Sequence, residues 1–295
     1  YTLVTADVAK HIAFQVMPIS ANGITGVADV SAYQGAIAAV PSFTGLLDTY
    51  SGAAVGYSLR KLRTAYSGNC IKVRRASDST ELDIGFVSNV LDTASLATFC
   101  SGTDGFVSVW YDQTGNSKDM SQGSASIQSK IVSAGSLENL NGKPCIKPLG
   151  SGYKLISTYN QNGGVSGKQI FAVTQRNSAT LDQCLLGSTT QNSDYVYFYK
   201  QAHTSTTINN LATLTSERLN GAAFSYTTRD SVYNALANQS IVSSNVVFNF
   251  GGTNLSIGYK GSANEMPNMQ EFVIFENQTD QAAKETAINS FYNAY

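Results

Sequence analysis

Apolar residues recur at every second position in several short stretches of this 295-residue chain, and turn-forming residues separate these stretches. The alternation predicts strands at residues 169–175, 194–200, 246–250, 255–259 and 271–276. Many short strands with no long helical pattern between them favour an all-β sandwich over a βαβ fold. The expected fold is therefore all-β, a two-sheet jelly-roll sandwich with short helices.

A β-hairpin is predicted in the first half of the chain. Ile71 and Val73 alternate with basic residues, a Ser-Asp-Ser turn follows at residues 77–79, and the apolar alternation returns at Leu82 and Ile84. Two apolar stretches of matching period, joined by a short turn, are typical of antiparallel strands that pair with each other.

The run GFVSVWYDQTGN predicts a strand followed by a tight turn. Strict alternation would place Phe106, Ser108 and Trp110 on one face of this strand. The turn consists of residues whose side chains bond nearby backbone amides or whose backbone suits left-handed positions. These turn residues are Asp112, Gln113, Gly115 and Asn116.

Three short helices complete the predicted elements. The first covers residues 53–62, and the second lies in the stretch LDTASLATFC, where Asp92 is expected to cap it. The third ends the chain, with Thr279 or Asp280 as its cap. Its apolar residues recur at helical spacing, at Ala283, Ala287, Ile288, Phe291 and Tyr295.

The domain boundary is expected near Pro41. Residues 1–40 contain an alternating stretch from Ile12 to Val16 and an Asn22-Gly23 turn, and residues 31–52 look like a connector rich in small residues. Residues 41–295 then form the sandwich domain. Because the chain starts in the middle of a pattern, we expect it to be part of a longer protein.

The charge content narrows the classes of partner. Charged residues make up only 13% of the chain and the formal net charge is −1, so the basic field that nucleic-acid binding needs is absent. No apolar run reaches 18 residues, so no membrane insertion is expected. A surface of Ser, Thr, Asn, Gln and Gly suits hydrogen bonding to sugar hydroxyls.

Cysteine and histidine argue against a metal site. The four cysteines, Cys70, Cys100, Cys145 and Cys184, show no C-x-x-C spacing, and the chain holds only two histidines. No cofactor is expected, and calcium binding by the Asp112 turn is the alternative interpretation of that motif. We predict mostly unpaired thiols, with two disulfides in a secreted protein as the alternative.

Two stretches resemble known families. Residues 53–147, with Trp110-Tyr111-Asp112-Gln113-Thr114-Gly115-Asn116 as the strongest signature, resemble the catalytic-domain fold of α-L-arabinofuranosidase B and its non-catalytic relatives in phage virion and bacterial surface proteins. Residues 255–295 resemble the end of laminin-G-like, or concanavalin A-like, sandwiches. The first forty residues resemble the last third of a bacterial immunoglobulin-like repeat, with Ala9 in place of a Gly.

The catalytic residues of the hydrolase family do not carry over in this resemblance. Its acid/base Asp follows a Gly-Ile-Gly-Gly segment, and the matching segment here is Ser256 to Lys260, with Tyr259 or Lys260 at the position of the Asp. Residues 194–210, which match the region of its nucleophile, contain no Glu, and Cys184 is followed by Leu185 instead of a second cysteine. The sequence therefore predicts no catalytic residues.

Candidate binding residues remain. Tyr195, Tyr197 and Tyr199 share one face and predict either a glycan-stacking surface, together with Tyr259 and Lys260, or packing within a sheet. For the turn at Asp112, Gln113, Gly115 and Asn116, we favour a structural role over a ligand or calcium loop. Three further acids have no visible partner in the sequence, Glu217, Glu265 and Glu271.

The resemblance implies a non-enzymatic module of a phage fibre or tail protein, located on the virion surface. Its expected partners are host-surface polysaccharide and other virion proteins, in a homotrimer that binds by avidity. The alternatives are a glycan-binding module of a secreted or cell-surface bacterial protein and an arabinofuranosidase-like glycoside hydrolase.

The connector provides the first testable prediction. Limited proteolysis should cut the chain between Ser31 and Ser51 and leave a stable C-terminal product, because this stretch lacks a sustained apolar pattern. Mass spectrometry of the fragments identifies the cut. A chain that resists cleavage throughout this window would show that the first segment packs onto the sandwich.

Overall fold

The computed structural model describes the chain except for residues 1–9, 11–12, 14, 32–42, 163–166, 178–180, 190–194, 210–211, 249–250 and 259–264. The chain divides into two compact units, Tyr1–Phe43 and Thr44–Tyr295. In the first unit, β1 (Gln15–Val16) pairs with β2 (Asp29–Val30) in antiparallel fashion. Ile12 lies outside the described residues, and the resemblance to an immunoglobulin-like repeat stays a prediction.

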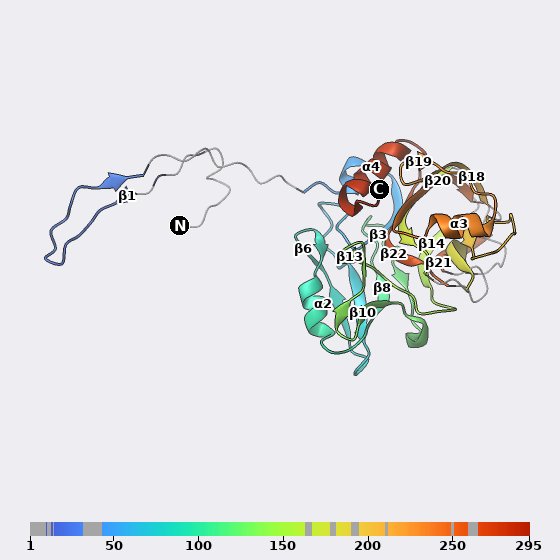
Figure 1. Ribbon diagram of the computed structural model, residues 1–295, viewed down its shortest axis with the longest axis horizontal. Coiled ribbons are helices and arrows are strands. Elements are labelled where there is room, and N and C mark those ends of the chain that lie inside the picture. Colours follow the sequence, from blue (N-terminus) through green and yellow to red (C-terminus); the bar gives the residue numbers. More distant parts are fainter. Residues whose placement is uncertain are drawn as a thin grey trace. The chain divides into compact units, whose positions relative to one another are not determined.

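The second unit is an all-β sandwich of two antiparallel sheets, as predicted (Figure 1). Among the described residues, the larger sheet has ten strands. They are β4 (Ile71–Arg75), β5 (Glu81–Ile84), β8 (Gly105–Trp110), β9 (Met120–Ser121), β10 (Lys130–Ser133), β11 (Ser136–Leu137), β14 (Leu155–Asn162), β16 (Gln183–Ser188), β17 (Tyr195–Tyr199) and β21 (Gly251–Ile257).

The smaller sheet has six strands in the described part of the chain, in the order β19-β18-β20-β15-β22-β3. Their bounds are β3 (Ala53–Ser58), β15 (Lys168–Gln175), β18 (Ala212–Leu219), β19 (Ala222–Ala223), β20 (Ser240–Phe248) and β22 (Asn268–Phe275). Two small ribbons pair β6 (Phe86–Val87) with β7 (Val90–Leu91) and β12 (Asn139–Leu140) with β13 (Lys143–Pro144). Four helices and a 3₁₀ turn are described: α1 (Leu46–Thr49), α2 (Thr93–Phe99), α3 (Arg229–Ala235), α4 (Gln281–Tyr292) and η2 (Ala125–Ile127).

The central strands of the smaller sheet are buried on both faces. In β15, Ile170 and Ala172 contribute to the core between the two sheets, whereas Phe171 and Val173 pack on the opposite face with Ile288 of α4. Two-sided burial explains why β15 reads QIFAVT, a nearly continuous apolar run instead of strict alternation. Helix α4 therefore covers the outer face of the smaller sheet (Figure 1).

Two expectations about local structure are wrong. Residues 53–62 do not form a helix, since Ala53–Ser58 is the edge strand β3, paired with β22. In β8, Lys72 pairs with Val109 and Val73 with Val107, so Ser108 is the extra residue of a bulge. The bulge reverses the alternation, which places Val107 and Trp110 on the core side together.

The predicted helix caps and strand bounds are confirmed only in part. The backbone N–H of Ser95 donates to the Asp92 carboxylate, which caps α2 as expected. Before α4, Asp280 instead adopts a left-handed backbone with φ +55° and makes no side-chain cap. The predicted hairpin is confirmed as β4 and β5, and β20 is longer than the expected strand at 246–250.

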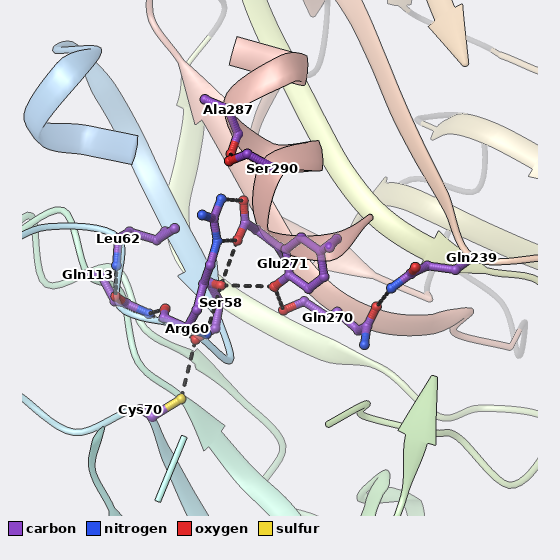
Figure 2. A network of polar contacts seen from close by, with 11 residues as sticks. Ser58, Arg60, Leu62, Cys70, Gln113, Gln239, Gln270, Glu271, Ala287 and Ser290 are labelled. Carbon is purple, nitrogen blue, oxygen red and sulfur yellow. Dashed lines mark hydrogen bonds and ion pairs between the residues drawn. The ribbon is translucent and has the colours of Figure 1, made fainter. Parts of the chain in front are cut away.

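A buried polar network joins β3 and the segment after it to β22 and α4 (Figure 2). The Arg60 guanidinium donates two hydrogen bonds to the Glu271 carboxylate, at 2.8 and 3.0 Å, and Ser58 donates a third at 2.7 Å. The guanidinium carbon also lies 5.0 Å from the ring centre of Phe291 and 5.4 Å from that of Tyr292. The Glu271 side chain is fully buried, so Arg60 is the charge that compensates it.

Removing Arg60 should destabilise the sandwich strongly. The variant Arg60→Met leaves the Glu271 carboxylate buried without its cation, which should cost about 3–5 kcal/mol of unfolding free energy. Denaturant unfolding measures this loss. The matched control is Arg75→Met, whose ion pair with Asp78 at 2.6 Å is exposed and should matter little. Equal stability of the two variants would contradict the structural role of the buried pair.

Candidate functional site

The turn after β8 is held by its own side chains. The Asp112 carboxylate accepts hydrogen bonds from the backbone N–H groups of Gly56, Thr114 and Lys118, at 3.0 to 3.2 Å. It also accepts the Thr114 hydroxyl, at 2.8 Å to Oδ1. Because both carboxylate oxygens are engaged with donors of the protein, the geometry agrees with the structural interpretation of Asp112.

Gln113 and Asn116 tie the same turn to strand β3. The Gln113 side-chain amide donates to the carbonyls of Ser58 and Arg60, and its Oε1 accepts the Leu62 N–H at 2.7 Å. Asn116 Nδ2 donates to the Ala54 carbonyl at 2.9 Å. The left-handed positions are Gly115, with φ +92°, and Ser117, with φ +55°, so the expectation of a left-handed Asn116 is wrong.

The tyrosines of β17 are buried. Tyr195, Tyr197 and Tyr199 are at most 4% exposed, because β17 pairs with β16 and faces the smaller sheet. The Tyr197 hydroxyl hydrogen-bonds Ser244 of β20 across the core, and burial raises the pKa of this tyrosine well above its usual value. Tyr197 and Tyr199 belong to the main core, whereas Tyr195 packs in a separate cluster with Cys184. None of the three rings therefore forms an open sugar platform. Tyr259 and Lys260 lie outside the described residues.

The segment matched to the hydrolase acid/base ends at a point where three segments meet. The Gly258 N–H donates to the Cys184 carbonyl at 3.0 Å, and the Cys184 N–H donates to the Glu265 carbonyl at 3.2 Å. Gly258 has φ +84°, and a Cβ there would lie 2.6 Å from the Tyr153 carbonyl oxygen, so the position requires glycine. Cys184 of β16 thus connects the end of β21 with the residues that lead into β22.

Glu265 is a buried carboxyl group at this junction. Only 1% of the residue is exposed, and its Oε1 accepts a hydrogen bond from Asn177 Nδ2 at 2.8 Å. The Asn177 backbone N–H in turn donates to Gln183 Oε1 at 2.8 Å, which fixes the asparagine. The Glu265 N–H donates to the Asp182 carbonyl at 2.9 Å, so the backbone brings a second acidic residue to the same place.

Two further buried polar atoms lie in the elements around Glu265. The Tyr199 hydroxyl and Asn268 Oδ1 have no hydrogen-bond partner among the described residues. Tyr199 is paired with Gln183 in the sheet, and burial, with smaller effects of Cys184 and Glu265, raises the pKa of its hydroxyl. Asp182 is partly exposed, and its carboxylate Oδ1 lies 3.9 Å from Lys200 Nζ. The junction therefore collects several groups that hydrogen-bond or titrate.

Other buried acids have structural partners. Glu271 is bound by Arg60 (Figure 2), and Glu285 accepts Arg218 Nε at 2.7 Å and the Ser243 hydroxyl at 2.5 Å. Glu217 accepts the Tyr226 hydroxyl, and burial raises the pKa of its carboxyl. From the sequence alone, Glu217, Glu265 and Glu271 could not be distinguished, because none of them had a visible partner. Their different surroundings come from the sheet pairing.

A signal for Glu265 is present in the sequence. It lies seven residues after Gly258, in the connection that leads from β21 in the larger sheet to β22 in the smaller one. Because Gly258 and Glu265 both hydrogen-bond to the backbone of Cys184, the acid lies near the glycine in the fold.

The described residues contain no group of three His, Cys, Asp or Glu side chains that could hold a metal ion. The four cysteines are buried thiols that form no disulfide with one another, in agreement with the prediction. Within the described ranges no helix is long and apolar enough to cross a membrane. The predicted homotrimer stays a prediction.

The turn at Asp112 yields a stability prediction. Asp112→Ala removes the acceptor of three backbone amides and should lower the unfolding free energy by about 1–3 kcal/mol. The matched control is Asp83→Ala, an exposed carboxylate that accepts the Tyr111 hydroxyl, and it should change the melting temperature little. If Asp112→Ala melts with the wild type, the carboxylate serves a ligand and not the turn.

Comparison with known proteins places the fold in a family. The model of the alpha-L-arabinofuranosidase B catalytic domain matches residues 48–213. Alpha-L-arabinofuranosidase B of Emericella nidulans is 34% identical over 85 residues, which cover 26% of this chain and 17% of that protein.

Solved structures of arabinofuranosidases are also similar. One is complexed with arabinofuranosyl-alpha-1,2-xylobiose, with a TM-score of 0.49, 15% identity and coverage of 85% of this chain and 64% of that one. A GH54 α-L-arabinofuranosidase soaked with a cyclic sulfate inhibitor has the same TM-score and identity, with 84% and 63% coverage. The chain thus spans less than two thirds of the length of these relatives.

These findings correct the functional expectation. The family match is to a catalytic domain of a glycosidase, and it overturns the expected non-enzymatic, receptor-binding module of a phage fibre or tail protein. The expected location and partners stay predictions. The matched residues include β8 and the Trp110 to Asn116 signature, and they cover more than half of the chain. The chain therefore belongs to the family of the alpha-L-arabinofuranosidase B catalytic domain.

Proposed function

We propose that this protein is a glycoside hydrolase that removes α-L-arabinofuranosyl groups. The observation that carries the proposal is the match of residues 48–213 to a catalytic-domain family. The similar proteins are named as arabinofuranosidases, and one of them holds an arabinofuranosyl-xylobiose ligand, which suggests the same class of substrate for this chain.

Hydrolysis of a glycosidic bond requires two carboxyl groups at the bond that breaks. One donates a proton to the leaving oxygen, and the other acts as nucleophile or activates water. The matched acid/base position carries Tyr259 or Lys260 instead of an Asp. Neither side chain is a carboxylic acid, so the proton donor has to come from another position.

We assign the role of acid/base to Glu265 in this proposal. Its backbone carbonyl and the Gly258 N–H both hydrogen-bond to Cys184, which brings it near the segment matched to the acid/base, and Asn177 holds one of its carboxyl oxygens at 2.8 Å. An orienting amide of this kind fixes the plane of the carboxyl group. Removal from bulk water favours proton transfer to the substrate over exchange with solvent.

Asp182 is the corresponding candidate for the second carboxyl group. Its backbone carbonyl accepts the Glu265 N–H, so the two residues are adjacent in space although 83 positions apart in the chain. The Lys200 ammonium lies 3.9 Å from its carboxylate, and a carboxylate at this position is the kind of group that a nucleophile or base requires.

The proposal predicts hydrolysis of 4-nitrophenyl α-L-arabinofuranoside by the purified protein. Glu265→Gln should lower kcat on the order of 10²–10⁴-fold, because the amide preserves shape but carries no transferable proton. Asp182→Asn should cause a comparable loss. Release of nitrophenol, with the melting temperature of each variant as a check on folding, measures both.

The control variant is Glu81→Gln, which changes an exposed glutamate of β5 in the same way. It should hydrolyse the substrate at the wild-type rate. No turnover by the wild-type protein would overturn the proposed activity. Full activity of Glu265→Gln would overturn the assignment of the acid/base.

A further inference from the structure

Two adjoining hollows lie along the start of edge strand β3. The first, of about 400 Å³, is lined by Ala54, Asn116, Lys118, Tyr159 and Glu276. The second, of about 230 Å³, is lined by Asp48, Tyr50, Arg63 and Thr114 among others. Gly52 and Ala53 line both hollows, which therefore adjoin at these two residues. We call the residues named in this paragraph the β3 groove.

The groove is preformed because hydrogen bonds fix its walls. Asn116 Nδ2 donates to the Ala54 carbonyl at 2.9 Å, and the Glu276 N–H donates to the Gly52 carbonyl at 2.8 Å. The Tyr159 hydroxyl donates to Glu276 Oε1 at 2.8 Å, and Lys168 pairs with the other carboxylate oxygen. A ligand would thus meet a wall that needs little ordering.

The chemistry of the groove matches a sugar chain. The Tyr159 ring offers an apolar face, while the Glu276 carboxylate, whose side chain is 45% exposed, offers acceptors for hydroxyl groups. Lys118 Nζ makes no hydrogen bond or ion pair within the described part of the chain, so its N–H groups can donate to a ligand. The small residues Gly52 and Ala53 leave room for a ring to approach the backbone.

The balance of charges argues for a neutral polymer. Asp48 and Glu276 contribute carboxylates, whereas Arg63 and Lys118 contribute cations, so the groove carries no field of a single sign. Nucleic acids and acidic polysaccharides require a basic field. Mixed donors and acceptors beside an aromatic ring instead suit the hydroxyl-rich, uncharged surface of a neutral polysaccharide.

The groove lies far from Glu265. Glu276 directly follows β22, whereas Glu265 precedes it, and an eight-residue strand spans roughly 26 Å. The two sites therefore belong to opposite ends of this strand. A sugar bound in the groove cannot be the one whose bond Glu265 would break.

We propose that the β3 groove is a second, non-catalytic site that binds the backbone of a neutral polysaccharide. Two adjoining hollows let consecutive sugar units bind together, and each unit adds to the affinity of a shallow surface. The choice of an arabinose-substituted polymer as the ligand rests on the proposed function. Binding in the groove keeps the polymer on the enzyme while the distant site acts on its branches.

Affinity electrophoresis in native gels that contain soluble arabinoxylan tests the groove. Wild-type protein should be retarded relative to a gel without polysaccharide. Tyr159→Ala removes the ring and Lys118→Ala removes the ammonium, and each should weaken retention roughly tenfold. Tyr159→Phe keeps the ring and should stay retarded. Lys118→Ala leaves the backbone carbonyl that accepts Tyr57 and Ser157 in place, so its fold should persist.

Hydrolysis of 4-nitrophenyl α-L-arabinofuranoside is measured on the same variants and should be unchanged, because this small substrate does not reach the groove. If Tyr159→Ala and Lys118→Ala are both retained like the wild type, or if the wild type itself is not retained, the proposed binding role of the groove is wrong. If retention depends on the groove but the protein hydrolyses no substrate, the proposed function is wrong and the proposed binding role of the groove still holds. Retardation of Glu265→Gln equal to wild type would show that binding does not depend on the hydrolytic site.

Discussion

The rest of this sandwich depends on how the outer edge of strand β3, the edge that does not pair with β22, is covered. β3 pairs with β22 on one side, and on the other side the turn from Asp112 to Asn116 bonds its backbone. The Asp112 carboxylate and the Gln113 backbone N–H satisfy the two polar groups of Gly56, at 3.0 and 2.8 Å. An uncovered edge would expose unpaired amides to other chains, and here one turn covers it and links the two sheets.

Closure of this edge explains both the strongest sequence signature and the β3 groove. Trp110, Asp112 and Gln113 of the signature are buried, and Asp112, Gln113 and Asn116 are hydrogen-bonded to β3. Their pattern therefore records a structural requirement before any chemical one. Where the turn leaves the first residues of β3, the backbone is covered only by small side chains. The groove forms at that place because Gly52 and Ala53 cannot fill it.

Burial divides the acidic residues into two kinds. Glu271 of β22 and Glu285 of α4 are compensated by Arg60 and Arg218, so these ion pairs help to hold the helix onto the smaller sheet. Glu265 lies between β21 and β22, and the Asn177 side-chain amide donates to its carboxyl group. A family of glycosidases needs carboxyl groups that can change protonation state, and a carboxylate in a bidentate ion pair is poorly suited to that.

The sequence by itself determined the all-β class, the hairpin of β4 and β5, the helix capped by Asp92 and the resemblance to the arabinofuranosidase fold, because each depends on local spacing or on a contiguous motif. Only the tertiary structure decided that residues 53–58 form an edge strand, since their small residues carry no period and their conformation comes from pairing with β22. The bulge at Ser108 is equally a property of pairing, because register exists only between two strands. The junction of Gly258, Cys184 and Glu265 brings together residues up to 81 positions apart, and no local pattern encodes a contact made by the packing of two sheets.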